Sequence, residues 1–229
     1  MEQKYEMRII AHIRTDFPEK FGVPRQSGLV KELIGRIVFE PEYRNPDALR
    51  GIEGYDYLWL LWKFEGVERE KWSPTVRPPR LGGETHVGVF ATRSPFRPNP
   101  IGLSSVKLEG IEQTAEGMVL IVSGIDLRDH TPIYDIKPYL PYVDSHPDAR
   151  GGFAEEKAGY ALEVVFPSEL LEKFPKAKQP AIVEVLKQDP RPAYHDDAQR
   201  QYGVAFAGFN VRFCVEEGVL TVFEGLEIQ

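Results

Sequence analysis

Cysteine is almost missing from this sequence of 229 residues, which contains only Cys214. A single cysteine excludes an intrachain disulfide and fits a reducing compartment, so we expect a cytoplasmic protein. Cys214 lies in the alternating apolar stretch "FNVRFCVEE", which predicts a thiol buried in the core. Long hydrophobic runs are missing too, because the most apolar segment, "YLWLLW", is far too short to cross a bilayer. The first residues form no apolar run of signal-peptide length, and we expect no membrane association.

Several recognisable site motifs are also absent. None of the five histidines stands at metal-ligand spacing from the cysteine or from a second histidine, so we expect no bound metal. The sequence has neither a Walker phosphate-binding loop nor the G-x-S-x-G motif of α/β hydrolases. The glycine cluster "RLGGETHVG" leads into a strand-like segment rather than a helix, which argues against a doubly wound nucleotide-binding sheet.

Basic residues are in the minority, with 28 Lys and Arg against 35 Asp and Glu. The net charge of −7 argues against indiscriminate nucleic-acid binding. Between residues 75 and 107, however, Glu84 is the only acidic residue among five basic ones: Arg77, Arg80, Arg93, Arg97 and Lys107. A cationic patch on an acidic protein suits a confined anionic ligand or one stretch of RNA backbone. A solvated surface loop is the alternative that charge alone leaves open.

Short apolar segments dominate residues 1–150, which we expect to form one domain. The strand candidates are "YEMRIIAHI", "GRIVFE", "YDYLWLLWKF", "HVGVFA", "GLSSVKLEGI", "GMVLIVSGIDL" and "TPIYDI". The aromatic and aliphatic density of "YDYLWLLWKF" predicts a strand buried on both faces. Asn45 and Pro46 begin a short helix, with Asn45 as its N-cap. Many short strands between Gly and Pro turns favour a mainly β fold built on a closed or nearly closed barrel.

Residues 151–229 are expected to form a smaller α+β domain that packs on the barrel. The polar stretch "DSHPDARGGFAEEKAGY" reads as a long loop or linker. Two helices are predicted after it, one capped by Ser168 and one ended by Pro190. The remaining segment, from Tyr202 onward, predicts a hairpin that turns at residues 216–218.

Two kinds of loop carry the candidate chemistry. "FGVPRQSGLV" presents Pro24, Arg25 and Gln26, which together could hold a polar planar ligand. "SPTVRPPRLGG" and "TRSPFRPNPIG" are proline-stiffened and cationic, and a stiff loop loses less entropy when it binds. Arg93 and Arg97 offer planar guanidinium groups to a carboxylate or phosphate. For two such loops in succession, we favour a binding site over a structural loop.

Two polar stretches add further candidates. In "DLRDHTPIYDIKPYLPYVD", Asp135, Lys137 and Tyr139 alternate and would share one face of a strand. They form either a polar active-site wall or a structural salt bridge, with nearly equal weight. "QDPRPAYHDD" combines Asp189 and Arg191 with Tyr194, and RNA-binding proteins use Arg and Tyr to hold phosphates and stack on bases.

Taken in order, these stretches resemble a known family. "FGVPRQSGLV", "WSPTVRPPRLGG", "VGVFATRSPFRPNPIGLS", "GIDLRDHTPIYDIKPYLPYVD" and "DPRPAYHDD…YGVAFAGFNVRF" occur in the order seen in bacterial tRNA methyltransferases that act on N6 of threonylcarbamoyl-adenosine 37. The resemblance spans nearly the whole chain. It implies a single-sheeted β-barrel that binds S-adenosylmethionine and the tRNA anticodon loop, commonly as a homodimer with the cofactor near the subunit interface.

The resemblance also assigns residues by motif. Those expected to contact the cofactor are Pro24, Arg25, Gln26, Phe64, Glu65, Arg93, Leu103, Asp129, His130, Thr131 and Pro132. The sequence departs from the family pattern at two of these positions, because related sequences usually have His in place of Glu65 and Gly in place of His130. Both departures lie beside the expected cofactor site.

The expected reaction is direct methyl transfer to N6, for which alignment of the reacting atoms can supply much of the rate. An N6 atom conjugated to a carbonyl is a poor nucleophile but a more acidic group, so a base would help. Our hypothesis assigns the base to Asp135, Asp189 or Tyr194. The residues expected to contact the substrate are Arg97, Lys137, Tyr139 and Arg191. A non-catalytic RNA- or nucleotide-binding barrel and a small-molecule methyltransferase are the alternatives.

Overall fold

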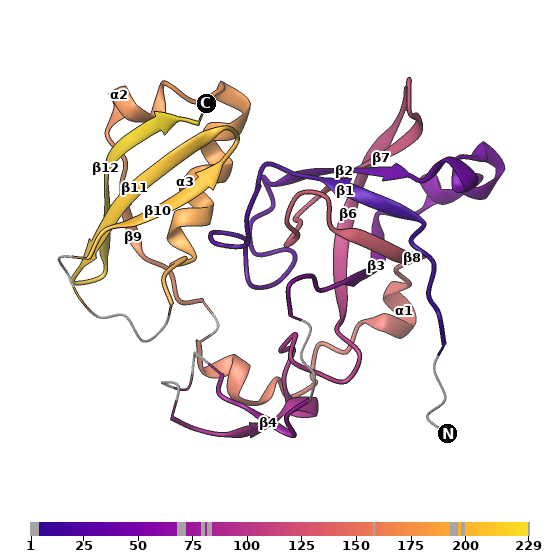
Figure 1. Cartoon of the computed structure of the whole chain (residues 1–229), viewed down its shortest axis with the longest axis horizontal. Coiled ribbons are helices and arrows are strands. Elements are labelled where there is room, and N and C mark those ends of the chain that lie inside the picture. Colours follow the sequence, from indigo (N-terminus) through magenta and orange to yellow (C-terminus); the bar gives the residue numbers. More distant parts are fainter. Residues whose placement is uncertain are drawn as a thin grey trace.

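The computed structural model describes residues 5–67, 72–78, 81, 84–157, 159–192, 197 and 200–228. It contains a closed six-stranded barrel and a separate four-stranded sheet accompanied by helices (Figure 1). The predicted fold class, a mainly β protein with a barrel and a smaller α+β unit, is confirmed. In the described part of the chain, no helix has the length and apolarity needed to span a membrane.

The barrel is one antiparallel sheet that closes on itself. Around the barrel the strands are β1 (Ala11–Arg14), β2 (Ile34–Phe39), β7 (Gly117–Ser123), β6 (Ile101–Thr114), β3 (Tyr57–Lys63) and β8 (Pro132–Pro138). Strand β8 pairs again with β1 and completes the ring. Closure removes the exposed edges that an open sheet of this kind would present.

Strand β3 shows how the barrel uses its apolar residues. Leu58, Leu60 and Trp62 point into the core. On the outer face, Tyr57 is exposed and Trp59 is only partly buried. The prediction of a strand buried on both faces is therefore wrong. A barrel strand has one core face, and the outer face of β3 carries large residues that remain partly or fully exposed.

Short 3₁₀ turns connect the strands on one side of the barrel. They are η1 (Pro41–Tyr43), η2 (Pro46–Leu49) and η3 (Ile52–Gly54). Asn45 caps η2 by accepting a hydrogen bond from the Asp47 backbone N–H at 3.0 Å, as predicted. The segment predicted as strand "HVGVFA" gives only β5 (Val87–Gly88), which pairs with β4 (Thr75–Val76) and is followed by η5 (Val89–Ala91).

The C-terminal unit has a sheet of strand order β10-β11-β12-β9. Its elements are β9 (Glu163–Val165), α2 (Ser168–Leu171), η7 (Lys176–Lys178), α3 (Gln179–Lys187), β10 (Tyr202–Phe206), β11 (Phe209–Glu216) and β12 (Val219–Glu227). The stretch predicted as a linker contains η6 (Gly152–Lys157) and follows the short helix α1 (Pro141–Asp144). Helix α3 buries Ala181, Ile182, Val185 and Leu186.

Three details of this unit correct the sequence predictions. Ser168 is the first helical residue and makes no side-chain cap, because Pro167 occupies the N-cap position. The single predicted hairpin is two hairpins, since Ala207 and Gly208 turn the chain a second time with positive φ angles. Cys214 is only partly buried, because it lies on the outward face of β11.

The segment between β1 and β2 joins the two units. Phe17 packs against Phe206 with ring centroids 5.1 Å apart, and Asp16 forms an ion pair with Lys178 at 2.5 Å. A Cβ on Gly22 would lie 2.6 Å from Val204, so the backbone approaches the C-terminal sheet closely. Figure 1 shows this indigo segment reaching from the barrel to the C-terminal unit. This segment contains Pro24, Arg25 and Gln26, which are predicted to bind a ligand, and it places them at the junction of the two units.

Candidate functional site

Two of the loops singled out in the sequence, "FGVPRQSGLV" and "TRSPFRPNPIG", meet in the structure. The Arg93 guanidinium donates a hydrogen bond to Gln26 Oε1, across 67 positions of sequence. Arg93 is exposed, and in the part of the chain that the structure describes no carboxylate forms an ion pair with it. Its remaining N–H donors can therefore bind an anionic or strongly polar ligand.

The loop of residues 24–28, here called the 24–28 loop, is anchored to the barrel wall. The Ser105 backbone N–H donates to Ser27 Oγ at 3.1 Å, and the Gly28 N–H donates to the Gly124 carbonyl at 2.8 Å. Because residues alternate along β6, Ser105 and Leu103 share its outward face. Leu103 is 54% exposed there, so the predicted cofactor contacts Gln26, Arg93 and Leu103 belong to neighbouring elements.

A hydrogen-bonded chain of polar side chains lies behind this loop. Trp62 Nε1 donates to Ser104 Oγ at 2.9 Å, and Ser104 Oγ donates to Asp126 Oδ1 at 2.6 Å. Burial raises the pKa of Asp126 to about 6, against the opposing effects of Ser104, two backbone amides and the charge of Arg93. No role is predicted for Asp126 from the sequence, although it opens the polar stretch that also contains Asp135 and Lys137. Its only signal is an aspartate between Ile125 and Leu127, which are both buried.

The end of β3 meets the turn that precedes β8. Glu65 forms an ion pair with Arg128, which links these two segments. Phe64, the residue before Glu65, packs on Trp62 with ring centroids 4.3 Å apart. The predicted cofactor contacts Phe64 and Glu65 are thereby connected to the turn of residues 129–132.

Within that turn, two predicted cofactor residues hold the backbone itself. Asp129 Oδ1 accepts a hydrogen bond from the Thr15 N–H at 2.9 Å. The Thr131 hydroxyl donates to the Arg128 carbonyl at 2.8 Å, and Thr131 is 4% exposed. Pro132 is buried at the first position of β8. These three residues therefore shape the turn, and His130 is its exposed member.

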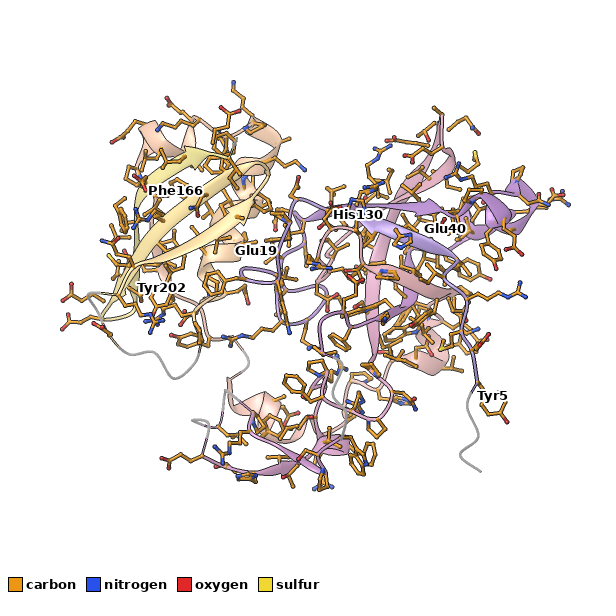
Figure 2. The ribbon with its side chains drawn as sticks, viewed as in Figure 1. Tyr5, Glu19, Glu40, His130, Phe166 and Tyr202 are labelled. Carbon is orange, nitrogen blue, oxygen red and sulfur yellow. The ribbon has the colours of Figure 1, made fainter. Side chains whose placement is uncertain are left out.

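His130 adopts a φ of 62°, in the left-handed region that favours glycine. Glycine, which the resemblance leads us to expect at this position in related sequences, would adopt this conformation without strain. The imidazole contacts the Arg14 guanidinium and lies beside a cavity of about 210 Å³. The cavity is lined by His12, Arg14, Val38, Phe39, Glu40, Arg44, Glu116 and His130. Figure 2 labels His130 and Glu40 on this part of the barrel.

The strained φ of His130 gives a testable expectation for stability. We expect His130→Gly to be more stable than His130→Ala by about 1 kcal/mol, because alanine keeps the left-handed strain and glycine relieves it. Both variants lose the Arg14 contact, so their difference isolates the backbone term. Urea denaturation at pH 7 measures it, and equal stability of the two variants would show that the turn relaxes without strain.

Asp135 and Lys137 share the outer face of β8, as predicted, and Tyr139 follows directly after the end of the strand. Lys137 Nζ lies 2.9 Å from Asp135 Oδ2, and this hydrogen bond raises the pKa of Lys137. Tyr139 packs against Tyr57 and Trp59 with ring centroids 6.2 and 5.6 Å away. The structure thus presents an exposed ion pair beside a cluster of three aromatic rings.

Arg97 has a different environment from Arg93, although only four residues separate them. Its guanidinium donates to the carbonyls of Thr92 and Ser94, at 3.0 and 3.3 Å. Arg97 therefore stabilises the loop to which it belongs. Among the described residues, no group of three or more His, Cys, Asp or Glu side chains is placed to hold a metal ion.

Asp189 and Arg191 form a mostly buried pair in the C-terminal unit. Arg191 donates to both carboxylate oxygens, at 2.8 and 2.9 Å, and Tyr160 donates to Oδ2 at 3.2 Å. Burial alone would raise the pKa of Asp189, but the hydrogen bonds and charge of Arg191 outweigh it and keep the pKa below its usual value. Tyr194, the third residue predicted here, lies outside the described residues.

Arg25 connects this pair to the 24–28 loop. Its guanidinium donates to the backbone carbonyls of Asp189 and Arg191, both at 3.2 Å. In the described ranges, no hydrogen bond or ion pair joins Asp189 or Arg191 to Asp135 or Lys137. The candidate catalytic groups therefore fall into two separate sets, of which the set with Asp189 contacts the 24–28 loop through Arg25.

Comparison with known proteins gives matches to both units. The family model described as tRNA-methyltransferase O N-terminal domain matches residues 12–145, and the model described as TrmO C-terminal domain matches residues 160–227. The chain is 43% identical to "tRNA (adenine(37)-N6)-methyltransferase" of Escherichia coli K12 over 227 residues, covering 96% of this chain and 97% of that protein. It is 42% identical to "Putative S-adenosylmethionine-dependent methyltransferase RcsF" of Pseudomonas aeruginosa, covering 89% and 90%.

Solved structures resemble the whole chain as well. A crystal structure of TrmO from Pseudomonas aeruginosa superposes with a TM-score of 0.76 and 33% sequence identity, covering 98% of this chain and 100% of that one. A second crystal structure of TrmO superposes with a TM-score of 0.77 at 33% identity, covering 97% and 99%. The likeness therefore includes the barrel and the C-terminal sheet together.

Proposed function

Because the chain belongs to the tRNA-methyltransferase O family, we propose that it is an S-adenosylmethionine-dependent enzyme that methylates N6 of threonylcarbamoyl-adenosine at position 37 of tRNA. The observation that carries this proposal is the meeting of Arg93 with Gln26 on the barrel wall. Relatives that match nearly the whole chain are named as adenine-37 N6-methyltransferases and S-adenosylmethionine-dependent methyltransferases.

The chemistry of the 24–28 loop and its neighbours fits the cofactor. S-adenosylmethionine supplies a methyl group on a positively charged sulfur, and it also carries a carboxylate, a ribose and an adenine ring. Arg93, which forms no ion pair with a described carboxylate, would bind the carboxylate, and the Gln26 amide would bind a polar edge. Leu103 and Phe64 would provide apolar contact. Pro24 and Arg25 would shape the loop backbone.

The turn that follows Arg128 would form the other side of the cofactor site. Its members Asp129, His130, Thr131 and Pro132 are held by the hydrogen bonds within the turn and to Thr15. The Glu65–Arg128 ion pair would set the distance between this turn and the end of β3. A histidine at the position of Glu65 could not form an ion pair with Arg128, because an imidazole is either neutral or positively charged. This ion pair would therefore be particular to chains with an acidic residue there.

Among the candidate bases, the contacts favour Asp135. Asp189 is bound through both oxygens by Arg191 and its pKa is lowered, which makes it a weak proton acceptor. Asp135 is 41% exposed on the outer barrel face, where its carboxylate pairs with Lys137 and accepts a hydrogen bond from the Ile136 N–H. In this proposal Asp135 accepts the N6 proton, while Lys137 orients its carboxylate and neutralises an anionic group of the substrate. Tyr194 is retained as the alternative acceptor.

The substrate would lie across both units. The rings of Tyr139, Tyr57 and Trp59 would stack on bases of the anticodon loop. Arg97 and Arg191 would contribute positive charge near the RNA backbone, while each keeps the protein contacts described above. We further propose that the enzyme is a cytoplasmic homodimer, with exposed Leu103 and Tyr57 close to the subunit interface.

Methylation of defined tRNAs tests this function. We expect purified protein with S-adenosylmethionine to add one methyl group to a tRNA carrying threonylcarbamoyl-adenosine 37, and none to the same transcript with plain adenosine 37. Mass spectrometry of the digested nucleosides measures the product. Cofactor binding in calorimetry without methylation of either tRNA would point to a small-molecule substrate, and absence of cofactor binding would contradict the proposal.

A further inference from the structure

Asp126 lies where three separate parts of the proposed cofactor site converge. These parts are the 24–28 loop, the loop that carries Arg93, and the wall strand β6. We propose that Asp126 is a positioning residue, which acts through Arg93 and Ser27 to hold the cofactor-binding loops in their productive arrangement. This role rests on the proposed function, because it concerns the affinity of the same site for S-adenosylmethionine.

The connection to β6 fixes the direction of a hydrogen bond. An indole N–H can only donate, so Ser104 Oγ must accept from Trp62. The single hydroxyl hydrogen of Ser104 is then donated to Asp126 Oδ1. Gly102 makes this geometry available, because a Cβ at that position would lie 2.1 Å from Trp62 Cε2. Ser104 is 0% exposed, so its hydroxyl is shielded from bulk solvent.

The connection to the loops is made through Ser27 and Arg93. The backbone amide of Ser27 faces Asp126, and the side chain of Ser27 accepts the Ser105 N–H. The positive charge of Arg93 favours the ionised carboxylate and lowers the pKa of Asp126, against the larger effect of burial. The same guanidinium donates to Gln26, the residue before Ser27. A carboxylate at position 126 therefore attracts both the loop amide and the arginine that the loop contacts.

The backbone around position 126 is held in place by its buried neighbours. Its neighbours Ile125 and Leu127 are each 1% exposed in the core, and Gly124 holds the 24–28 loop through the Gly28 N–H. The carboxylate is consequently a fixed acceptor, and the loops adjust to it.

Asp126 gains its charge within an accessible pH range. Ionisation should strengthen cofactor binding but should lower the free energy of unfolding. Its pKa is raised to about 6, so above that pH the carboxylate attracts Arg93 and below it the attraction disappears. Cofactor affinity should fall on acidification through pH 6. The free energy of unfolding should change in the reverse direction. Because the pKa is raised in the folded state, protonated Asp126 stabilises the fold below about pH 4, and this stabilisation is lost as pH rises through 6. If Asp126 had a merely structural role, cofactor affinity and the free energy of unfolding would not change in opposite directions with pH.

Calorimetric titration with S-adenosylmethionine at several pH values tests the proposal. Wild-type affinity should fall by about tenfold between pH 7.5 and pH 5. Asp126→Asn should bind about tenfold more weakly than wild type at pH 7.5 and as well as wild type at pH 5. Glu109→Gln is the matched control, because Glu109 also accepts a hydrogen bond from a barrel serine, Ser123, at 2.5 Å. That control should follow wild type at every pH.

Each outcome supports or overturns the role of Asp126. Equal affinity of Asp126→Asn and wild type at every pH overturns it while leaving the proposed function intact. If wild type itself does not bind S-adenosylmethionine, the proposed function fails and this role fails with it. Should Asp126→Asn not fold, Ser104→Ala is the second variant. Loss of the Ser104 hydrogen bond should move the midpoint of the affinity change above pH 6, and an unmoved midpoint also overturns the role.

Discussion

Arg93→Ala is expected to lower the affinity for S-adenosylmethionine by about a hundredfold while leaving the protein folded. Hydrogen bonds between a guanidinium and a carboxylate contribute about 1.5–3 kcal/mol, which corresponds to roughly 10- to 150-fold in affinity. Arg93 is exposed, and its guanidinium donates a hydrogen bond to Gln26 without forming an ion pair with any carboxylate in the described part of the chain. Its removal should therefore change the free energy of unfolding by less than about 0.5 kcal/mol. Calorimetry and urea denaturation measure the two effects separately.

Two further variants define what Arg93 contributes. Arg93→Lys keeps the charge and loses the planar fork, so we expect an intermediate affinity. Arg97→Ala is the control within the same loop. Because Arg97 donates to the Thr92 and Ser94 carbonyls, its loss should reduce stability more than the loss of Arg93 does. Unchanged affinity in Arg93→Ala would show that the loop is scaffold and that the cofactor binds elsewhere.

The contrast between these two arginines shows what the sequence could predict. Proline stiffening and charge identify the loop, and resemblance to a family selects Arg93. The partner of each guanidinium depends on tertiary structure. Gln26 reaches Arg93 only because the chain between β1 and β2 returns across β6. Arg97 instead meets carbonyls within five residues of itself. Local patterns carry no information that distinguishes these two outcomes.

The sequence pattern predicts the barrel, but it does not predict which face of each strand points into the core. Short apolar segments between turns predict strands, and closure follows from the cost of exposed edges. In β3, however, nearly every residue is large and apolar, so alternation gives no signal for the outward face. Asp126 is the reverse case, a polar residue hidden in an apolar segment. Its acceptor role depends on Ser104, which is 22 residues away.

Asp189 and Arg191 were predicted as a base and a substrate contact, and the structure places them in one mostly buried ion pair. Arg191→Ala should lower the free energy of unfolding by about 3 kcal/mol, because it leaves the Asp189 carboxylate buried without its partner. Removing both polar groups in Asp189→Asn with Arg191→Met should recover much of this loss. Urea denaturation followed by circular dichroism measures all three proteins.

The pH dependence of the free energy of unfolding tests whether Asp189 and Arg191 act as a buried ion pair or as a surface contact. In wild type, Arg191 lowers the pKa of Asp189, so its contribution is present above about pH 4 and is lost as pH falls below it. In Arg191→Ala, burial is no longer opposed by Arg191 and the pKa of Asp189 should rise. The destabilisation should then be largest near neutral pH and should shrink on acidification toward pH 4.5. A loss of stability that is the same at pH 7.5 and pH 4.5 would mean that Asp189 reaches water once Arg191 is removed, and that the pair serves the RNA-facing surface rather than the fold.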